Sequence, residues 1–453
     1  MQTCYLAVDI GASSGRHIIG TVEHGVMALH EVYRFENRLI EKNGHLCWDM
    51  EGLVQNVIEG LKAAHDAGYT PTTVGIDTWA VDFLLLDADG TPIGDPVAYR
   101  DGRTAAMREE LEPILPFTKL YARTGIQYQS FNTVYQLCAL KKEHPEQLAA
   151  AEHFLMVPDY LNYRLTGVMA NEYTNASTTA LVGAISKDWD DEIINRLGLP
   201  RKIFGRISIP GTKLGNLSSA VKDYVGFDCT VVLPATHDTG SAFLAVPARD
   251  DKAVYLSSGT WSLLGVENKD PITTPASMQA NFTNEGGYEY RYRYLKNIMG
   301  LWMIQSIRRE LNGVDYAEGK TRAEWTLDVA AGERQWTFPD LIASAEGAAD
   351  FESIVDANDD AFLAPDSMIA AVQKACECSG QPVPTTVGQL MQCVYRSLTL
   401  CYKNAIAGLS RLTGKEYTTI HIVGGGCQDN YLNRMTASVT GLPVWAGPVE
   451  GTA

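Results

Sequence analysis

Residues 9–16 read DIGASSGR, and this stretch decides how the fold is interpreted. Residues 5–8 before it are apolar and β-prone, and β-branched residues return over residues 17–22. A turn of glycine, alanine and serine lets backbone N–H groups and hydroxyls face a phosphate, because small residues permit close approach. The stretch is neither a Walker A loop nor GxGxxG. It is therefore either a phosphate-binding turn or a plain hairpin turn.

A similar pattern returns past the middle of the chain. Residues 253–256 are a candidate strand, residues 257–260 read SSGT, and residues 261–266 are a second candidate strand. The two halves share no close sequence repeat, yet each begins with strand, small polar turn and strand. This predicts a duplicated α/β architecture with a cleft between the halves, in which the two turns could grip a polyphosphate from opposite walls.

Helical periodicity separates these strands. Residues 49–67 carry one apolar face, with Asp49 placed to cap the start, and residues 299–311 and 389–412 show the same period. Residues 419–423 form a candidate buried strand that runs into a glycine triplet centred on Gly425. Three glycines suit either the passage of the backbone against a flat ring or a simple strand-to-helix turn. Residues 330–360 are rich in Ala, Asp and Glu and are expected to be an irregular surface insertion.

Residues 236–241, THDTGS, follow an apolar strand expected at residues 230–234. Strand ends are where α/β proteins place ligands and catalytic groups. Asp238 could act as a general base for a hydroxyl, with His237 and Thr239 bonding neighbouring hydroxyls, or it could only cap the helix that follows. Asp9 ends another apolar strand, and a carboxylate beside phosphates requires a cation, such as Mg²⁺ held through waters.

Charge and cysteine usage narrow the function classes. There are 37 Lys and Arg against 54 Asp and Glu, which gives a formal net charge of −17. Binding to nucleic acid or to an anionic membrane surface is not expected, because both require an excess of cations. No signal peptide or apolar run of about 18 residues is recognisable. The nine scattered cysteines argue against a disulfide framework, so a cytoplasmic location is expected.

Taken together, seven stretches resemble the FGGY carbohydrate kinases across the whole chain and in order. They are DIGASSGR at residues 9–16, GIDTWAVDF at 75–83, YRDGR at 99–103, THDTGSA at 236–242, YLSSGTWSL at 255–263, LKNIMGLWMIQ at 295–305 and HIVGGGCQ at 421–428. The resemblance implies two actin-like (ribonuclease H-like) ATPase domains with ATP and sugar between them. The expected domains are residues 1–245, with the sugar site and the base, and residues 246–453, with the nucleotide site and apparently without the family's last helix.

The resemblance also implies roles for individual residues. The catalytic base would be Asp238, and Asp9 would help to hold Mg²⁺. The sugar contacts would be Ala80, His237, Asp238, Thr239 and Asn297. The contacts to ATP would be Ala12, Ser13, Ser14, Gly15, Arg16, Thr260, Gln305 and Gly425. The pattern usually has a glycine at Ala80, so the added methyl group bears on the choice of sugar.

The reaction implied by the resemblance is ATP-dependent phosphorylation of L-rhamnulose at its 1-hydroxyl by a monomer or small homo-oligomer. Two alternatives remain open at this point. One is a kinase for another ketose, such as xylulose or fuculose. The other is a non-catalytic actin-like scaffold that binds ATP. The run His237-Asp238-Thr239 argues against this alternative. An unperturbed Asp238, with a pKa near 3.9, would suffice as the base.

Overall fold

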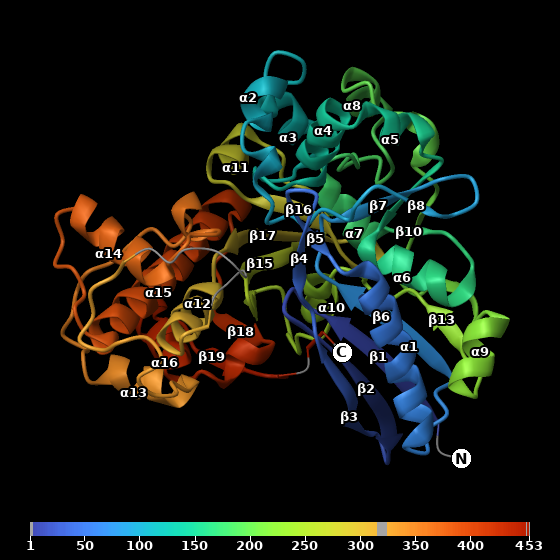
Figure 1. Cartoon of the computed structure of the whole chain (residues 1–453). Helices are drawn as coiled ribbons and strands as arrows, with labels where there is room; N and C mark the ends of the chain where they lie inside the picture. The colour runs from blue at the N-terminus through green and yellow to red at the C-terminus, as the bar shows by residue number, and fades with distance from the viewer. Residues whose placement is uncertain (1–2, 315–323, 450, 453) are drawn as a thin grey trace. The chain divides into compact units, whose positions relative to one another are not determined.

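A computed structural model describes residues 3–314, 324–449, 451 and 452 (Figure 1). The chain divides into two compact units, which are described separately. Unit 1 holds Met1–Leu244, Glu267–Tyr294 and Thr452–Ala453, and unit 2 holds Ala245–Val266 and Leu295–Gly451. The expected division at residues 245 and 246 stays a prediction.

The main sheet of unit 1 has the strand order β12-β13-β6-β1-β2-β3. Its strands are β1 (Cys4–Ile10), β2 (Ser14–Glu23), β3 (Val26–Glu36), β6 (Thr73–Thr78), β12 (Lys213–Asn216) and β13 (Thr230–Val232). Strand β1 lies antiparallel to β2 and parallel to β6. Helix α1 (Met50–Asp66) packs against β2 and β3 through its apolar face, and the side chain of Asp49 caps it by accepting from the amide of Gly52. This helix and its cap confirm the sequence-based prediction.

The rest of unit 1 consists of short helices and strands. The helices are α2 (Met107–Leu111), α3 (Phe117–Thr124), α4 (Thr133–Glu143), α5 (Pro145–Ala150), α6 (Val157–Thr166), α7 (Tyr173–Ala176), α8 (Asp191–Arg196), α9 (Ser219–Val225), α10 (Asp238–Leu244) and α11 (Pro275–Gln279). The strands are β4 (Leu39–Lys42), β5 (His45–Trp48), β7 (Phe83–Leu86), β8 (Pro92–Ile93), β9 (His153–Met156), β10 (Asn171–Glu172), β11 (Ile207–Ser208) and β16 (Thr283–Gly286).

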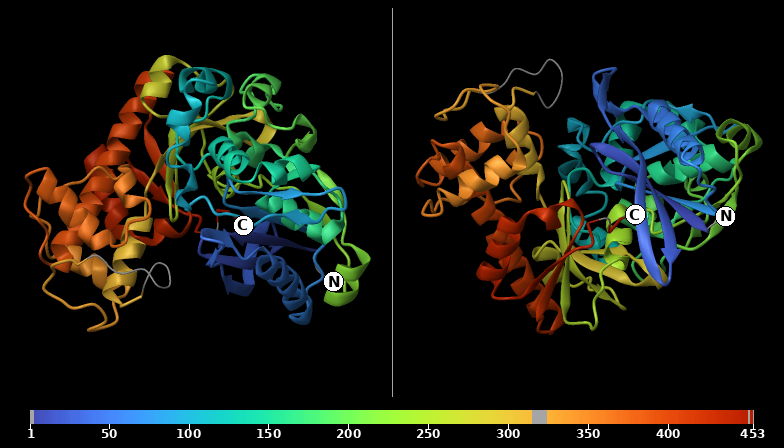
Figure 2. Two further views of the ribbon diagram at one scale, coloured as in Figure 1. Left: turned by 45° about the horizontal axis from the view of Figure 1, so that its top comes forward. Right: turned by 90° about the horizontal axis from the view of Figure 1, so that it is seen from below.

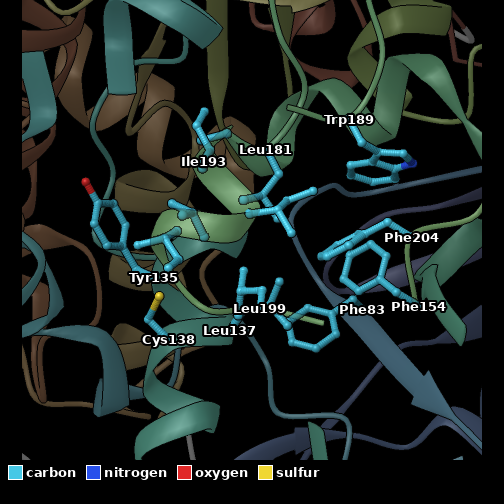
Figure 3. Packing of buried hydrophobic residues seen from close by; sticks show 14 of the residues in the cluster. Phe83, Tyr135, Leu137, Cys138, Phe154, Leu181, Trp189, Ile193, Leu199 and Phe204 are labelled. Carbon is cyan, nitrogen blue, oxygen red and sulfur yellow. The ribbon is translucent and has the colours of Figure 1, made fainter. Parts of the chain in front are cut away.

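A largely aromatic core holds many of these short elements together. Figure 3 shows the rings of Phe83, Phe154, Phe204 and Trp189 gathered around one another. The ring centroids of Phe83 and Phe154 are 5.1 Å apart, and those of Trp189 and Phe204 are 4.9 Å apart. Because β7 pairs with β9, this core fixes the strand that follows the loop at residues 79–82. The core therefore anchors one edge of the candidate site.

Unit 2 combines strands with a group of long helices, coloured orange and red in Figure 2. The strands are β14 (Ala253–Ser258), β15 (Ser262–Asn268), β17 (Tyr292–Ile298), β18 (Thr419–Val423) and β19 (Val444–Ala446), of which β15 and β17 also contribute residues to unit 1. The helices are α12 (Trp302–Leu311), α13 (Phe338–Glu346), α14 (Met368–Cys378), α15 (Val387–Thr413) and α16 (Asn430–Thr440). The long α15 packs against both α13 and α16.

The strand orders of the two sheets match. The order β13-β6-β1-β2-β3 corresponds to β19-β18-β14-β15-β17. The first three strands of each series are parallel, and the next pair, β1 with β2 or β14 with β15, is antiparallel. Both units therefore follow one βαβ-containing plan, which confirms the predicted duplicated α/β fold.

One local expectation was wrong. Within residues 330–360, expected to be irregular, α13 forms with a capping box between Thr337 and Asp340 and buries Leu341 and Ala345 against α15. Two other elements have exact starts that bear on the site. Strand β7 begins at Phe83, two residues after Val81, whose φ of 68° interrupts the extended backbone. Helix α10 begins at Asp238.

Within the described ranges, no helix combines the length and the apolar character that a membrane span needs.

Candidate active site

In unit 1, two carboxylates lie side by side at the ends of parallel strands. Asp9 on β1 is in register with Asp77 on β6, and on its other side Asp9 pairs with Arg16 on β2. The guanidinium of Arg16 donates to Asp9 Oδ2 from Nε at 3.0 Å and from Nη2 at 2.8 Å. The hydroxyl of Thr452 donates to the same oxygen. Asp9 Oδ2 is thus held as a hydrogen-bond acceptor at the mouth of the small-residue turn.

That turn contains Ala12 and Ser13 and is closed by main-chain bonds. The amide of Gly11 donates to the carbonyl of Ser14 at 2.9 Å, and the amide of Asn37 donates to the carbonyl of Ser13 at 3.1 Å. The side chain of Asn37 also donates to the carbonyl of Gly11 at 3.0 Å. These bonds fix the backbone of the turn between β1 and β2, so that Ala12 and Ser13 lie in the turn and Ser14 to Arg16 lie at the start of β2.

Asp77 is the site residue that sequence reasoning missed. Burial raises the pKa of Asp77 well above its usual range, and the nearby carboxylates of Asp9 and Asp238 raise it further. Its Oδ1 atom is buried without a hydrogen-bond partner among the described residues. Three carboxylates therefore converge in unit 1, an arrangement that favours either a bound proton or a cation. The signal was present in the sequence, because Asp77 follows a buried strand just as Asp9 does.

The run His237-Asp238-Thr239 lies at the start of α10 and beside the end of β6. The amide of Thr78 donates to the carbonyl of Thr236 at 2.9 Å, and Thr78 forms a parallel bridge with His237. The amides of Gly240 and Ser241 donate to the carbonyl of His237 at 2.6 and 3.2 Å. His237 rather than Asp238 thus occupies the N-terminal capping position of α10, and the Asp238 side chain is not required as the cap.

Asp238 is partly open to solvent, with 30% of its side chain exposed. Thr239 Oγ1 donates to its Oδ1 at 3.1 Å, and His237 Nε2 lies 3.4 Å from the same atom. Burial raises the pKa of Asp238 despite the opposing effect of His237, and Asp9 raises it further. An unperturbed carboxylate would suffice as a base, and these surroundings make Asp238 a stronger base than a free aspartate.

The loop at residues 79–82 is fixed by a second buried carboxylate. Asp82 Oδ2 accepts from Trp48 Nε1 at 2.6 Å and from Trp79 Nε1 at 3.0 Å, and its Oδ1 accepts from Gln136 at 3.0 Å. The rings of Trp48 and Trp79 are in contact, with centroids 4.2 Å apart and planes tilted by 39°. Ala80 lies in this loop and is half-buried. The positive φ of Val81 is unusual for a β-branched residue, and the surrounding bonds hold the loop in this shape.

In unit 2, the ends of β14 and β18 are adjacent, since Ser257 is in register with Val423. Gly424 has φ 85°, a left-handed conformation that favours glycine. A Cβ on Gly426 would lie 2.0 Å from Ser258 Oγ, whereas a Cβ on Gly425 would meet no atom within 4 Å. Gly425 is exposed, so this one glycine of the triplet borders open space.

The other predicted contacts of unit 2 lie nearby in the chain. The carbonyl of Thr260 accepts from the amide of Trp302 at 2.9 Å, which ties the turn after β14 to the start of α12. Gln305 lies in the first turns of α12 and is half-buried, and Asn297 lies on β17. Within each unit the predicted residues therefore gather at corresponding strand ends: Asp9, Ala12 to Arg16, Ala80 and residues 237–239 in unit 1, and Thr260 and Gly425 in unit 2.

The carboxylates of unit 1 bear on the Mg²⁺ site that the sequence predicts. In the part of the chain that the structure describes, no three His, Cys, Asp or Glu side chains are arranged to coordinate a metal ion directly. The cluster of Asp9, Asp77 and Asp238 nevertheless combines an orphaned buried oxygen with three acidic groups. This chemistry fits a hydrated cation held through waters, as the sequence analysis expected of Asp9.

Comparison with known families decides the class of protein. Residues 4–245 match the N-terminal domain and residues 254–453 the C-terminal domain of the FGGY family of carbohydrate kinases. The chain belongs to the FGGY family of carbohydrate kinases. It is a carbohydrate kinase, and the resemblance drawn from the sequence motifs is confirmed.

Curated members of the FGGY family cover the whole chain. A protein named rhamnulokinase from Oceanobacillus iheyensis is 46% identical over 453 residues, which span 100% of this chain and 92% of that protein. Another rhamnulokinase, from Halalkalibacterium halodurans, is 47% identical over 448 residues, 99% of this chain and 91% of that protein.

Solved structures of FGGY kinases share the fold. The ligand-bound xylulose kinase from Lactobacillus acidophilus has a TM-score of 0.78 at 15% identity and covers 99% of this chain and 87% of its own. Glycerol kinase from Plasmodium falciparum with ADP has a TM-score of 0.73 at 13% identity, over 100% of this chain and 87% of its own. At this identity the likeness supports the two-domain FGGY fold and nothing finer.

Proposed function

We propose that this FGGY kinase transfers the γ-phosphoryl group of ATP to the 1-hydroxyl of L-rhamnulose, giving L-rhamnulose 1-phosphate and ADP. The choice of sugar is carried by one observation: relatives named rhamnulokinase are 46% and 47% identical over the full chain. The same observation does not favour xylulose or fuculose as the acceptor, nor a non-catalytic scaffold. A cytoplasmic location and a monomer or small homo-oligomer are part of the proposal, with no nucleic-acid or membrane partner.

Asp238 is the proposed catalytic base. Phosphoryl transfer asks the protein mainly to position the reactants and to stabilise charge on the phosphate oxygens. The raised pKa and the partial exposure of Asp238 support its role, since a stronger base with an open side takes the hydroxyl proton more readily. Ala80, His237, Thr239 and Asn297 are the proposed sugar contacts.

The proposed nucleotide contacts belong to the turn between β1 and β2 with the start of β2, to the turns after β14 and β18, and to α12. Residues Ala12 to Arg16 would bind phosphate oxygens, and Thr260, Gln305 and Gly425 would contact the rest of ATP. The open space beside Gly425 supports an approach of the nucleotide there. Asp9, with Asp77 beside it, would hold Mg²⁺ through waters, and the cation would supply positive charge to the phosphate oxygens.

The decisive experiment measures ADP release against a panel of ketoses. We expect the highest kcat/KM with L-rhamnulose, and a clear preference for xylulose or fuculose would overturn the proposed sugar. ATP hydrolysis that does not depend on sugar and yields no sugar phosphate would instead support a scaffold.

The base is tested in the same assay. Asp238→Asn keeps the shape of the side chain but removes the proton acceptor, so kcat should fall by about 10²- to 10⁴-fold while the sugar still binds. Asp66→Asn is the matched control, because Asp66 is an exposed residue that pairs with Lys62 on the surface of α1. Near-normal kcat in Asp238→Asn would exclude the assignment of the base.

A further inference from the structure

Arg293 is a fully buried cation next to the candidate base. It lies on β17 and its side chain has no exposure. Its Nε donates to the carbonyl of Gly286 at 2.9 Å, and its Nη2 donates to the carbonyl of Thr174 at 3.4 Å. Its Nη1 lies 3.1 Å from Glu285 Oε2. Burial lowers the pKa of Arg293, and the carboxylates of Glu285, Glu172 and Asp238 oppose that effect.

The guanidinium also contacts the ring of His237. Arg293 Nη1 lies 3.1 Å from His237 Nδ1. A guanidinium has donors only, so in this bond Nδ1 must be the acceptor and must carry no proton. A neutral imidazole then carries its one proton on Nε2. That nitrogen lies 3.4 Å from Asp238 Oδ1.

Glu285 would favour the opposite tautomer of His237, with the proton on Nδ1, but the geometry disfavours that tautomer. Glu285 Oε2 lies 3.3 Å from His237 Nδ1 and would require a proton on that nitrogen. Arg293 is the closer partner of Nδ1, and its positive charge also faces Glu285 at 3.1 Å. The carboxylate is therefore matched by the guanidinium, and Nδ1 is left to accept.

The main chain around His237 is equally fixed. Its amide donates to Thr174 Oγ1 at 3.2 Å. The neighbouring Thr236 donates from its amide and its hydroxyl to Glu172 Oε2, at 3.1 and 2.7 Å. With the backbone held by Thr174 and Glu172, the remaining freedom of His237 is its ring orientation and its tautomer. Arg293 acts on both.

We propose that Arg293 is a positioning residue for phosphoryl transfer, which holds His237 as the tautomer protonated on Nε2 and directs that N–H toward Asp238 and the acceptor hydroxyl. The inference rests on the proposed function, in which Asp238 is the base. With the other tautomer, a nitrogen lone pair would face the carboxylate and repel it. With the Nε2–H tautomer, Asp238 Oδ1 is anchored and its second oxygen is free to take the proton.

Arginine is suited to this role for a physical reason. Its charge persists when it is buried, and its planar group serves Gly286, Thr174 and His237 in fixed directions. Glu285 offsets the cost of burying that charge, because an unpaired buried cation would be strongly destabilising. The pair should therefore be altered together in a test.

The first test uses the unaltered enzyme and reads the tautomer directly. The ¹⁵N spectrum of histidine-labelled, deuterated protein at neutral pH distinguishes protonated from bare ring nitrogens, and the loss of one signal set in His237→Gln assigns the residue. We expect His237 to show a bare Nδ1 and a protonated Nε2. A proton on Nδ1 would overturn the inference, whether or not any variant folds.

The second test removes the pair in the double variant Arg293→Met with Glu285→Gln. We expect kcat to fall by roughly 10- to 100-fold, as when the outer partner of a functional histidine is lost, with the KM for ATP unchanged. The ¹⁵N signals of His237 should shift toward a mixture of tautomers. The matched control is the double variant Arg291→Met with Glu267→Gln, which removes an ion pair of 3.4 Å whose arginine is exposed. This control should keep both the kcat and the ¹⁵N signals of His237.

The two proposals fail in different ways. If the unaltered enzyme phosphorylates no ketose, the proposed function fails, while the ¹⁵N spectrum still reports the tautomer. If the unaltered enzyme is active and the double variant keeps both its kcat and a single Nε2–H tautomer, Arg293 has no positioning role and the inference fails alone.

Discussion

His17 is a single buried residue whose protonation should lower the stability of the fold at acidic pH. Its ring lies between β2 and α1, where Nε2 donates to the carbonyl of Val57 at 3.0 Å. Its Nδ1 is buried without a hydrogen-bond partner among the described residues. Burial lowers the pKa of His17 from 6.5 to about 4, although the bond to Val57 opposes the effect. The folded protein therefore resists a proton that the unfolded chain takes up.

The sign of the pH effect follows from this difference. Stability from neutral His17 is complete above pH 6.5 and is lost as the pH falls toward 4, because the unfolded state then binds the extra proton. Between pH 7 and pH 5 we expect unit 1 to lose about 2 kcal/mol of unfolding free energy through this group. Urea unfolding at both pH values, compared with His17→Phe, measures it. An equal loss in the variant would contradict the prediction.

Residues also differ in how far sequence alone could assign them. Asp9, His237 and Asp238 were recognisable, because each polar side chain interrupts or ends an apolar strand. Glu285 and Arg293 were not, since their importance comes from the partners that they meet after folding. The raised pKa of Asp238 was equally inaccessible, because it depends on burial and on Asp9 from a distant strand.

Among the elements, the turn after β18 contains one glycine that packing requires and one that borders open space. A methyl group on Gly426 would collide with the side chain of Ser258, so Gly426→Ala should cost about 1–3 kcal/mol of stability. Gly425→Ala has open space and should leave stability unchanged. If ATP passes there, the KM for ATP should rise by about tenfold, equivalent to ~1.4 kcal/mol, with kcat little changed.

Thermal unfolding and steady-state kinetics of both variants check this prediction. Gly414→Ala is not a suitable control, because Gly414 has φ 69°. The better control is Gly102→Ala, which meets no atom within 4 Å and lies in unit 1. An unchanged KM for ATP in Gly425→Ala would place the nucleotide elsewhere.

Elements with strong local signals were predictable and those shaped by partners were not. The strand Thr419–Val423 and the helix α1 follow from apolar patterns and a cap. Helix α13 was missed, because it is short, lies within a stretch rich in Ala, Asp and Glu, and is stabilised by packing on α15. The start of β7 at Phe83 depends on the strained backbone of Val81, which no period in the sequence reveals.

For the whole molecule, the matching strand orders explain how a chain with net charge −17 can belong to a family that binds a polyanion. Each unit offers a small-residue turn after a buried strand, where backbone amides and hydroxyls act locally. Bulk positive charge is then unnecessary. The duplication was predictable from the two turns, whereas the exchange of chain segments between the units was not.

The proposed assignment of the sugar to unit 1 and of the nucleotide ring to unit 2 predicts which amides each ligand protects from hydrogen exchange. The proposed sugar contacts are concentrated in unit 1, at Ala80 and residues 237–239, and the ring of the nucleotide is assigned to unit 2, near Gly425. L-Rhamnulose alone, at about 100 times its Kd, should slow exchange up to ~100-fold for amides that open through unfolding of unit 1. ADP should slow the exchange of amides chiefly in residues 253–266 and 419–428.

Hydrogen exchange followed by mass spectrometry measures both patterns on the full chain. Asp238→Asn should keep the protection by sugar, because that variant loses the base and not the fold, and Gly425→Ala should weaken only the protection by ADP. Protection by sugar confined to unit 2 would contradict the assignment of the sugar contacts. Protection by ADP that survives unchanged in Gly425→Ala would contradict the assignment of the nucleotide, because the added methyl group occupies the space in which ADP is expected to lie.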